Sequence, residues 1–415
     1  MKHALLFCAL SVLFFFLIAA IPVNDKAVRE KAAQIHKSIL TIDTHCDTPM
    51  RLVRGNWDVG VYHDPKERKA GKIDLPRMKQ GGLDAEFFAV FLGQGPRTPE
   101  DIQEVRKKAD DIFNAIKQMC QKYSDTIELA LNPDDAYRLE KEGKLACYIG
   151  MENGYPVGTD LDYVQRYFDM GARYITLCHT RNNDICDSST DPKGPEFHGL
   201  SDFGEKVVAE MNRLGMIVDI SHVSDETFYD VIKITKAPIM ASHSDTRALC
   251  DNPRNLTDDM IKALAENGGV LQMCLLSGYV KKPKPNPERE AALEELWQKY
   301  GKWDEIKSDS VRNIVRKEYY AIREKYPEKR ATVKDLVDHI DHVVQLVGID
   351  YVGIGTDFDG GGGLADCNDV SEMGNITLEL VRRGYSEDDI RKIWGGNFMR
   401  VFRRVQEVAK ELNRK

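Results

Sequence analysis

Histidine and carboxylate side chains occur in this sequence in a pattern that can bind metal ions. His45 and Asp47 are separated by one residue, and side chains two apart on an extended segment point the same way, about 6.5–7 Å apart along the backbone. Both can therefore reach a single ion. Imidazole and carboxylate ligands without thiolate suit zinc, with manganese or cobalt as substitutes, and bound zinc activates water for hydrolysis. Further candidates of the same chemical types are Glu152, His179, His222, His243 and Asp357.

Short apolar runs rich in β-forming residues precede most of these side chains. Between the runs the sequence has helical periodicity and helix caps, as at Ser201, which can begin a helix that ends before Gly215. Alternating strands and helices predict a parallel sheet, and eight such units predict a closed (β/α)8 barrel of the TIM type. An error of one strand would instead give an open, doubly wound sheet. The eight runs are residues 39–43, 85–92, 145–150, 174–178, 216–220, 238–242, 269–275 and 351–356.

The barrel prediction places the candidate side chains at one mouth, because the C-terminal ends of the strands carry the catalytic groups of such barrels. Four of the ten histidines in the chain fall at these strand ends. A carboxylate at Glu152 can bridge two cations, which in two-metal hydrolytic sites are about 3.5–4 Å apart. In chain order, the mouth would carry His45 and Asp47 after the first run, Glu152 after the third, His179 after the fourth, His222 after the fifth, His243 after the sixth and Asp357 after the eighth.

The composition fits one folded domain with an insertion. The 415 residues are 42% hydrophobic and carry a net charge of -8, which excludes a mainly disordered chain and argues against nucleic-acid binding through a basic surface. We expect residues 22–415 to form a single domain. Residues 281–328, between the seventh and eighth strands, begin with Lys-Lys-Pro-Lys-Pro-Asn-Pro and continue as a charged helical excursion. We interpret this excursion as a surface helix or interface rather than a lid.

Residues 1–21 have the pattern of a secretory signal peptide. Lys2 and His3 precede an unbroken apolar stretch, residues 4–21, which is followed by Pro22 and charged residues. We therefore expect an exported protein, periplasmic or extracellular. The stretch is near the lower limit for spanning a bilayer, so an uncleaved anchor is the alternative, and membrane association is expected only in that case. The nine cysteines are scattered without a C-x-x-C motif, and the sequence assigns no disulfide pairs.

Five segments of the chain carry a resemblance to a known family. They are residues 41–47 (TIDTHCD), 150–154 (GMENG), 219–224 (DISHVS), 241–244 (ASHS) and 355–360 (GTDFDG). In this order and strand context they resemble the renal (membrane) dipeptidase family, a branch of the metal-dependent amidohydrolase barrels. The resemblance implies a homodimeric enzyme with two zinc ions that hydrolyses dipeptides through a metal-bridging hydroxide. It also implies tolerance of a D-residue at the C-terminal position of the substrate.

The resemblance implies a role for each candidate side chain. His45, Asp47 and Glu152 would bind the first zinc ion, and Glu152, His222 and His243 the second. His179 would contact the substrate and stabilise the oxyanion, Arg254 would bind the substrate carboxylate, and Asp357 would move the proton. The residue types agree with these roles. A planar guanidinium suits a free carboxylate, and a carboxylate beside two cations stays ionised and can accept a proton from water.

Two other functions remain open on the sequence alone. An amidohydrolase of other specificity, such as an N-acyl-amino-acid deacylase or a lactonase, would use the same metal centre. A non-catalytic metal-binding barrel would keep the ligands without turnover, although the proton-transferring Asp357 favours an enzyme. A tyrosine that the family places just after the seventh strand falls near Leu276 here, with Tyr279 close by, so the preferred dipeptide is left open.

Overall fold

The computed structural model describes residues 25–414 apart from residues 56, 68, 303, 304 and 307. The signal peptide or anchor predicted for residues 1–21 lies outside the described residues. Within them, no helix combines the length and the apolar character that a membrane crossing requires.

Eight parallel strands form a barrel, in the order β1-β2-β4-β5-β6-β7-β8-β9. They are β1 (Ile42–Cys46), β2 (Ala85–Phe91), β4 (Leu145–Glu152), β5 (Ala172–Thr176), β6 (Ile217–Asp219), β7 (Met240–Ser244), β8 (Val270–Met273) and β9 (Val352–Ile354). The ring closes where the chain beyond β9 meets β1. There the Asp357 N–H donates to His45 O at 3.0 Å, and the Asp47 N–H donates to Phe358 O at 2.8 Å. The predicted (β/α)8 barrel is confirmed, and the open, doubly wound sheet is wrong.

Every predicted strand is present, but the first begins three residues further along the chain. Ile39 and Leu40 are buried in the connection that follows α1 (Asp25–Ser38). The strand itself is Ile-Asp-Thr-His-Cys, and all five residues are buried. Its central residues are polar and are enclosed by the ring, so a search for apolar runs does not locate the strand exactly. A further strand, β3 (Ile127–Leu129), has no counterpart in the sequence prediction because three residues are too few to show alternation; it pairs with β4 outside the ring.

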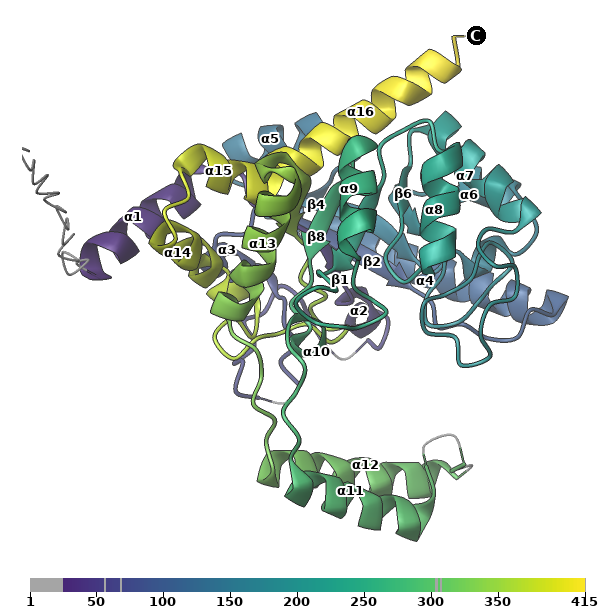
Figure 1. Cartoon of the computed structure of the whole chain (residues 1–415), viewed down its shortest axis with the longest axis vertical. Helices are drawn as coiled ribbons and strands as arrows, with labels where there is room; N and C mark the ends of the chain where they lie inside the picture. The colour runs from purple at the N-terminus through teal and green to yellow at the C-terminus, as the bar shows by residue number, and fades with distance from the viewer. Residues whose placement is uncertain (1–24, 56, 68, 303–304, 307, 415) are drawn as a thin grey trace, which may run out of the picture.

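Helices lie between successive strands and cover the outside of the ring (Figure 1). They are α3 (Leu75–Gly81), α4 (Pro99–Lys122), α5 (Pro133–Lys141), α6 (Asp162–Asp169), α7 (Asp202–Leu214), α8 (Asp225–Ile234), α9 (Asp258–Glu266) and α13 (Val333–Val347). The predicted cap is present, because Ser201 Oγ accepts from the Gly204 N–H at 2.9 Å. Gly215 ends α7 in the left-handed conformation, with φ 80°.

The C-terminal helix α16 (Asn397–Leu412) closes the end of the barrel where the strands begin. Its Phe398 and Phe402 are buried among inward-facing side chains of the strands. The ring of Phe87 on β2 lies 5.2 Å from that of Phe398, and 5.4 Å from that of Tyr174 on β5. These packed rings fix the position of Tyr174 inside the barrel, below the end where the strands finish. The chain reaches α16 from β9 through α14 (Gly374–Arg382) and α15 (Glu387–Arg391).

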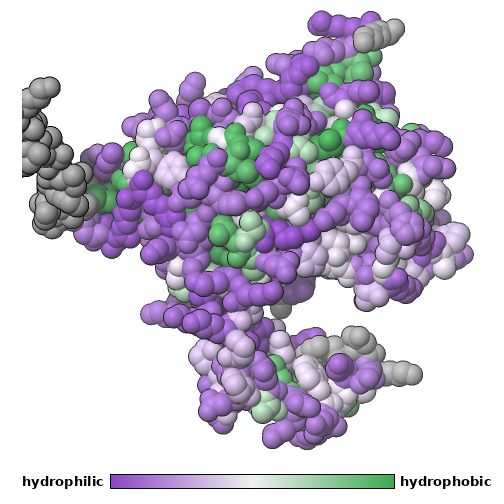
Figure 2. Space-filling model, viewed as in Figure 1, coloured by the Kyte–Doolittle hydropathy of each residue, from purple (hydrophilic) through white to green (hydrophobic). Residues whose placement is uncertain are grey.

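The predicted charged excursion is a helical hairpin between β8 and β9, which we call the arm (residues 281–328). Two short helices, α2 (Pro49–Leu52) and α10 (Ser277–Val280), lie at the mouth, and the arm follows α10. Helices α11 (Pro287–Tyr300) and α12 (Asp309–Lys325) pack on each other around Leu296, Ile306 and Val315. The hairpin stands away from the barrel (Figure 1), and most of its visible surface is hydrophilic or intermediate (Figure 2). The excursion is confirmed as a surface feature of the fold.

A buried carboxyl group beside β2 gives the fold a measurable pH dependence. The Thr41 N–H and hydroxyl donate to Asp84 Oδ2 at 2.9 and 3.0 Å, yet burial raises the pKa of Asp84 to about 6. Because this pKa exceeds the unfolded value of about 3.9, the folded state binds more protons between the two values. The contribution of Asp84 to stability is therefore present at low pH and is lost as the pH rises through about 6.

We expect Asp84→Asn to increase the free energy of unfolding at pH 7.5 by up to about 3 kcal/mol, because it removes a buried charge and keeps an acceptor oxygen for Thr41. The gain should disappear near pH 4. Urea unfolding of the wild type and the variant at both pH values measures it. Asp125→Asn, at an exposed loop position, is the control and should change nothing. Equal stability of Asp84→Asn and wild type at pH 7.5 would contradict the account.

Candidate active site

The structure brings all eight predicted site residues together at the mouth of the barrel. A cavity of about 410 Å³ opens there, and seven of the eight line it. His45 lies just beneath, fully buried, with its Nε2 3.3 Å from Glu152 Oε2. The lining residues among the predictions are Asp47, Glu152, His179, His222, His243, Arg254 and Asp357.

Glu152 is at the centre of the cluster. It is the last residue of β4, and its carboxylate is 3% exposed. Its Oε1 lies 3.1 Å from His222 Nε2 and 3.6 Å from His243 Nε2. His179 Nε2 is also 3.6 Å from the same oxygen. One buried carboxylate therefore faces imidazole rings that come from β1, β7 and the segments after β5 and β6.

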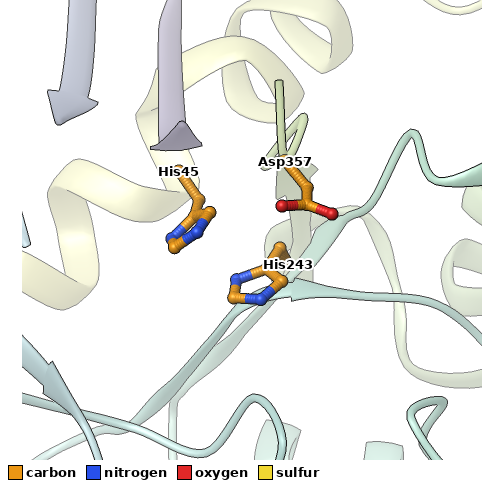
Figure 3. Close-up of side chains that lie close together, drawn as sticks. All are labelled: His45, His243 and Asp357. Atoms are coloured by element: carbon orange, nitrogen blue, oxygen red, sulfur yellow. The ribbon is translucent and has the colours of Figure 1, made fainter. Parts of the chain in front are cut away.

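Three overlapping groups of side chains could each hold a metal ion. Within each group the ligand atoms all lie within 4.8 Å of one another. The groups are His45 with Asp47 and Glu152, Glu152 with His179 and His222, and His45 with His243 and Asp357. Figure 3 shows the third group, with the side chains of β1, β7 and the loop after β9 converging. The first group repeats the set that the sequence proposes for one ion. For the other ion, His222 Nε2 lies 2.9 Å from His243 Nε2, so both rings aim at the same space.

Unpaired acceptors show that these residues fit a divalent cation. His45 Nε2, Asp47 Oδ1 and Glu152 Oε2 are buried and make no hydrogen bond within the described structure. Buried polar atoms are almost always paired, and several unpaired lone pairs aimed at one space repel one another. A cation removes both problems. Nitrogen and carboxylate oxygen donors without thiolate suit zinc, manganese or cobalt.

Hydroxyl groups behind two of the imidazole rings fix how these rings present their nitrogens. His45 Nδ1 lies 2.8 Å from the Tyr174 hydroxyl, which donates onward to Thr44 O at 3.2 Å. His243 Nδ1 lies 2.7 Å from Ser242 Oγ, which donates to Asp219 Oδ2 at 2.7 Å. Each hydroxyl uses its own proton elsewhere, so it accepts from Nδ1–H. With a proton on Nδ1, both rings turn Nε2 toward the cluster, and Nε2 is the nitrogen that a bound metal would take.

Burial and neighbouring charges set the protonation of the cluster. Burial lowers the pKa of His222 and of His243 well below the usual value, with Arg254 and His45 respectively adding to the effect. Burial would raise the pKa of Glu152, but His45, His222 and His179 together bring it well below its usual range. Glu152 is therefore ionised, and His222 and His243 are neutral and can donate lone pairs.

Asp357 differs from Glu152 in its protonation. Burial and the charge of Asp47 raise the pKa of Asp357 well above its usual range, while burial raises the pKa of Asp47 to about 6. These carboxyl groups face the same cavity, so a cation between them would favour their ionised forms.

Strained backbone surrounds the cluster. Asn153, His222, Asp357 and Asp359 adopt left-handed conformations, with φ 80°, 73°, 58° and 66°. Such conformations in non-glycine residues cost energy and gather at functional sites. Asp359 was not among the predicted residues, and it anchors the loop after β9 by accepting from Thr48 Oγ1 at 2.8 Å and from Arg51 Nε at 2.9 Å.

Arg254 forms the wall beside β7. Its guanidinium is buried, and it donates to His243 O at 3.1 Å and to Ser244 Oγ at 3.3 Å. Its Nε has no hydrogen-bond partner among the described residues. Tyr279, which stands where the sequence left the substrate tyrosine open, has its ring centre 5.3 Å from the Arg254 guanidinium carbon. A buried guanidinium beside a metal cluster suits an anionic ligand.

His36 and His339 make structural contacts and do not line the active-site cavity. His36 bonds to Thr377 Oγ1 and Gly81 O, and His339 to Thr246 and Val280 O. The sequence pattern of strand ends separates these from the site histidines. The eight described cysteines are all buried as free thiols.

Comparisons with known proteins agree with this geometry. The family model Membrane dipeptidase (Peptidase family M19) matches residues 29–415. Dipeptidase tcpJ of Claviceps purpurea (strain 20.1) is 32% identical over 375 residues, 88% of this chain and 77% of that protein. Dipeptidase 3 of Rattus norvegicus is 30% identical over 397 residues, 94% of this chain and 70% of that protein. The crystal structure of the probable dipeptidase PvdM from Pseudomonas aeruginosa is 32% identical, with a TM-score of 0.80 over 92% of this chain and 99% of that chain.

The barrel and its cluster of imidazoles and carboxylates define a metal-dependent hydrolase. The chain belongs to the membrane dipeptidase family, peptidase family M19, and is a metallo-dipeptidase. The family predicted from the five sequence segments is confirmed.

Removing the Tyr174 hydroxyl tests whether its contact with His45 Nδ1 orients this proposed metal ligand. We expect Tyr174→Phe to lower metal affinity by about 10- to 100-fold. Without the hydroxyl, the His45 ring loses the partner that fixes its orientation and keeps the proton on Nδ1. Metal retained after dialysis against graded chelator, measured by mass spectrometry, gives the affinity. Tyr148→Phe is the matched control, since its buried hydroxyl donates to Asn132 O at 2.8 Å, away from the site. Equal metal retention by the two variants would show that Tyr174 does not orient His45.

Proposed function

We propose that this protein is an exported dipeptidase that uses two zinc ions to hydrolyse the peptide bond of dipeptides, including those with a C-terminal D-residue. The observation that carries the proposal is the position of Glu152, whose buried carboxylate faces four imidazoles beside unpaired acceptors from His45 and Asp47. One carboxylate with two oxygens aimed at two sets of nitrogens is the arrangement that bridges a pair of cations.

In this proposal His45, Asp47 and Glu152 hold one ion, and Glu152, His222 and His243 hold the other, with manganese or cobalt as substitutes. When bound, the two ions supply an activated water and polarise the scissile carbonyl group. The roles of the remaining side chains follow from their positions around the cavity.

His179 lies on the substrate side of the cluster. Burial lowers the pKa of this histidine, so it is neutral near pH 7 and can donate a hydrogen bond without carrying a charge. Its ring meets Phe91 edge-on at 4.8 Å, which limits its rotation. A fixed neutral donor above the metal cluster can stabilise the negative charge that develops on the carbonyl oxygen during attack.

Asp357 is placed to move the proton. It converges with His45 and His243, and beside bound cations it is ionised. It can then accept a proton from the attacking water and pass it to the nitrogen of the leaving amine. Breaking a peptide bond needs this transfer, whereas metal binding alone does not.

Arg254 would place the scissile bond next to the C-terminus of the substrate. A guanidinium buried in the wall of the cavity would bind the free carboxylate of a C-terminal residue, so the scissile bond would be the last one in the chain. A deacylase acting on N-acyl amino acids also needs this contact, but a lactonase does not.

The proposal also covers the export of the protein and its assembly into a dimer. The apolar segment of residues 4–21 supports export, and membrane association would follow only if that segment stays attached. We also propose that the chain is one hydrolase domain and works as a homodimer, for which the arm is a candidate contact.

Two variants separate metal binding from proton transfer. We expect Glu152→Gln to lose bound metal and activity together. Asp357→Asn should keep metal and lower kcat by about 10²- to 10⁴-fold, because it removes only the proton carrier. Metal content by mass spectrometry and hydrolysis of L-Ala-L-Ala and L-Ala-D-Ala measure both. The outcomes should differ because Glu152 is a proposed ligand of both ions, whereas Asp357 is proposed only to carry the proton. Full activity of either variant would break the assignment.

Arg254→Met separates a dipeptidase from a lactonase. We expect kcat/KM for dipeptides to fall by about 100-fold or more, mainly through KM, because the substrate carboxylate loses its buried partner. Arg166→Met is the control, since Arg166 pairs with Asp110 at 2.9 Å outside the cavity. Parallel assays with an N-acyl amino acid and a lactone show which substrate is used. Undiminished hydrolysis of dipeptides by Arg254→Met would exclude the proposed carboxylate contact.

A further inference from the structure

A second cavity lies directly beside the active-site cavity and has no role in the chemistry described above. Its volume is about 450 Å³, comparable to the 410 Å³ of the site itself. The two cavities share Met50 and Phe91 as lining residues. The second cavity continues from this shared wall between the loop after β2 and helix α4.

The walls of this side cavity are mainly apolar. Leu92, Val105, Ile112 and Tyr155 line it and are themselves buried. Its rim is acidic, with Asp101, Glu104 and Asp111 against a single Lys108, which is paired with Glu104 at 2.6 Å. An apolar space with a negative rim favours apolar groups and disfavours acidic ones.

The order of strands around the ring places this cavity opposite Arg254. Phe91 ends β2, and Arg254 follows β7. In the order β1-β2-β4-β5-β6-β7-β8-β9, β2 and β7 are four positions apart in either direction, so they face each other across the mouth. Glu152 and the histidines lie between them.

A dipeptide bound through Arg254 would span the mouth in one direction. If Arg254 holds the C-terminal carboxylate, as the proposed function requires, the scissile carbonyl lies over Glu152. The N-terminal residue then extends toward Phe91 and Met50. This step rests on the proposed function, and it brings the N-terminal side chain to the shared wall of the side cavity.

We propose that the side cavity is a specificity subsite that receives the N-terminal side chain of the dipeptide and selects long or bulky apolar side chains. Met50 is suited to the boundary because an unbranched thioether can adapt to ligands of different shape. Phe91 is the fixed part of the boundary, since it meets His179 edge-on at 4.8 Å. A substrate side chain that packs on Phe91 therefore contacts the same ring that packs on His179.

The first test compares dipeptides that differ only in the N-terminal residue. For the metal-loaded wild type, kcat/KM for Leu-Ala, Met-Ala and Phe-Ala should exceed that for Gly-Ala by roughly 10- to 200-fold. Glu-Ala should be the poorest substrate of the series because of the acidic rim. Equal kcat/KM for Leu-Ala and Gly-Ala would overturn the subsite alone. Failure to hydrolyse any of these dipeptides would overturn the proposed function, and this inference with it.

The second test fills the cavity. A Cβ atom at Gly93 meets no other atom within 4 Å, and its φ is not in the left-handed region, so Gly93→Phe can add a ring without backbone strain. We expect the ratio of kcat/KM for Leu-Ala over Gly-Ala to fall at least tenfold. Gly374→Phe is the matched control, because Gly374 also has open space around its Cβ but begins α14, outside both cavities.

Val105→Phe narrows the same cavity from α4 and guards against an outward-pointing ring at position 93. Thermal unfolding of each variant confirms that the fold is kept. A lower Leu-Ala over Gly-Ala ratio in Gly93→Phe or Val105→Phe, with Gly374→Phe unchanged, supports the subsite. An unchanged ratio in both folded cavity variants overturns it.

Discussion

The carboxylate of Glu152 is buried among nitrogen atoms from four histidines, and the rest of the structure serves to keep it there. These histidines come from different segments of the ring, so the cluster exists only when β9 returns to β1. Buried lone pairs facing one another are costly without a cation between them. The closed barrel supplies the rigidity that keeps the acceptors in place against this repulsion.

The same constraint explains the layer beneath the mouth. Tyr174 carries its hydroxyl to His45 while its ring packs on Phe87, which in turn meets Phe398 of α16. The C-terminal helix therefore supports a metal ligand at the far end of the barrel through two aromatic rings. Supporting contacts of this kind are as necessary to a metal site as the ligands themselves.

Much of this arrangement could be predicted from the sequence because parallel strands in a ring end at one face. His45, Glu152, His222 and His243 follow or end short apolar runs, so the fold places them together. The exact course of β1 could not be predicted, since its Asp43, Thr44 and His45 are polar residues enclosed by the ring. An apolar pattern records burial of apolar side chains only.

Contacts between distant residues were also beyond prediction. Tyr174 reaches His45 across 129 positions in the chain, and Asp359 reaches Arg51 across 308. Neither pair has a local signal, and the left-handed backbone at His222 and Asp357 has none either. The side cavity depends on how α4 packs beside the loop after β2, which spacing in the sequence does not report.

The arm leaves the barrel and returns to it at nearly the same point. The Ala331 N–H donates to Ser277 Oγ at 2.8 Å, and Lys281 Nζ lies 2.5 Å from Asp335 Oδ1. With its two ends clamped in this way and a core of its own, the arm behaves as a module inserted into an otherwise continuous turn. Its length and composition can therefore diverge between relatives without altering the strand register on which catalysis depends.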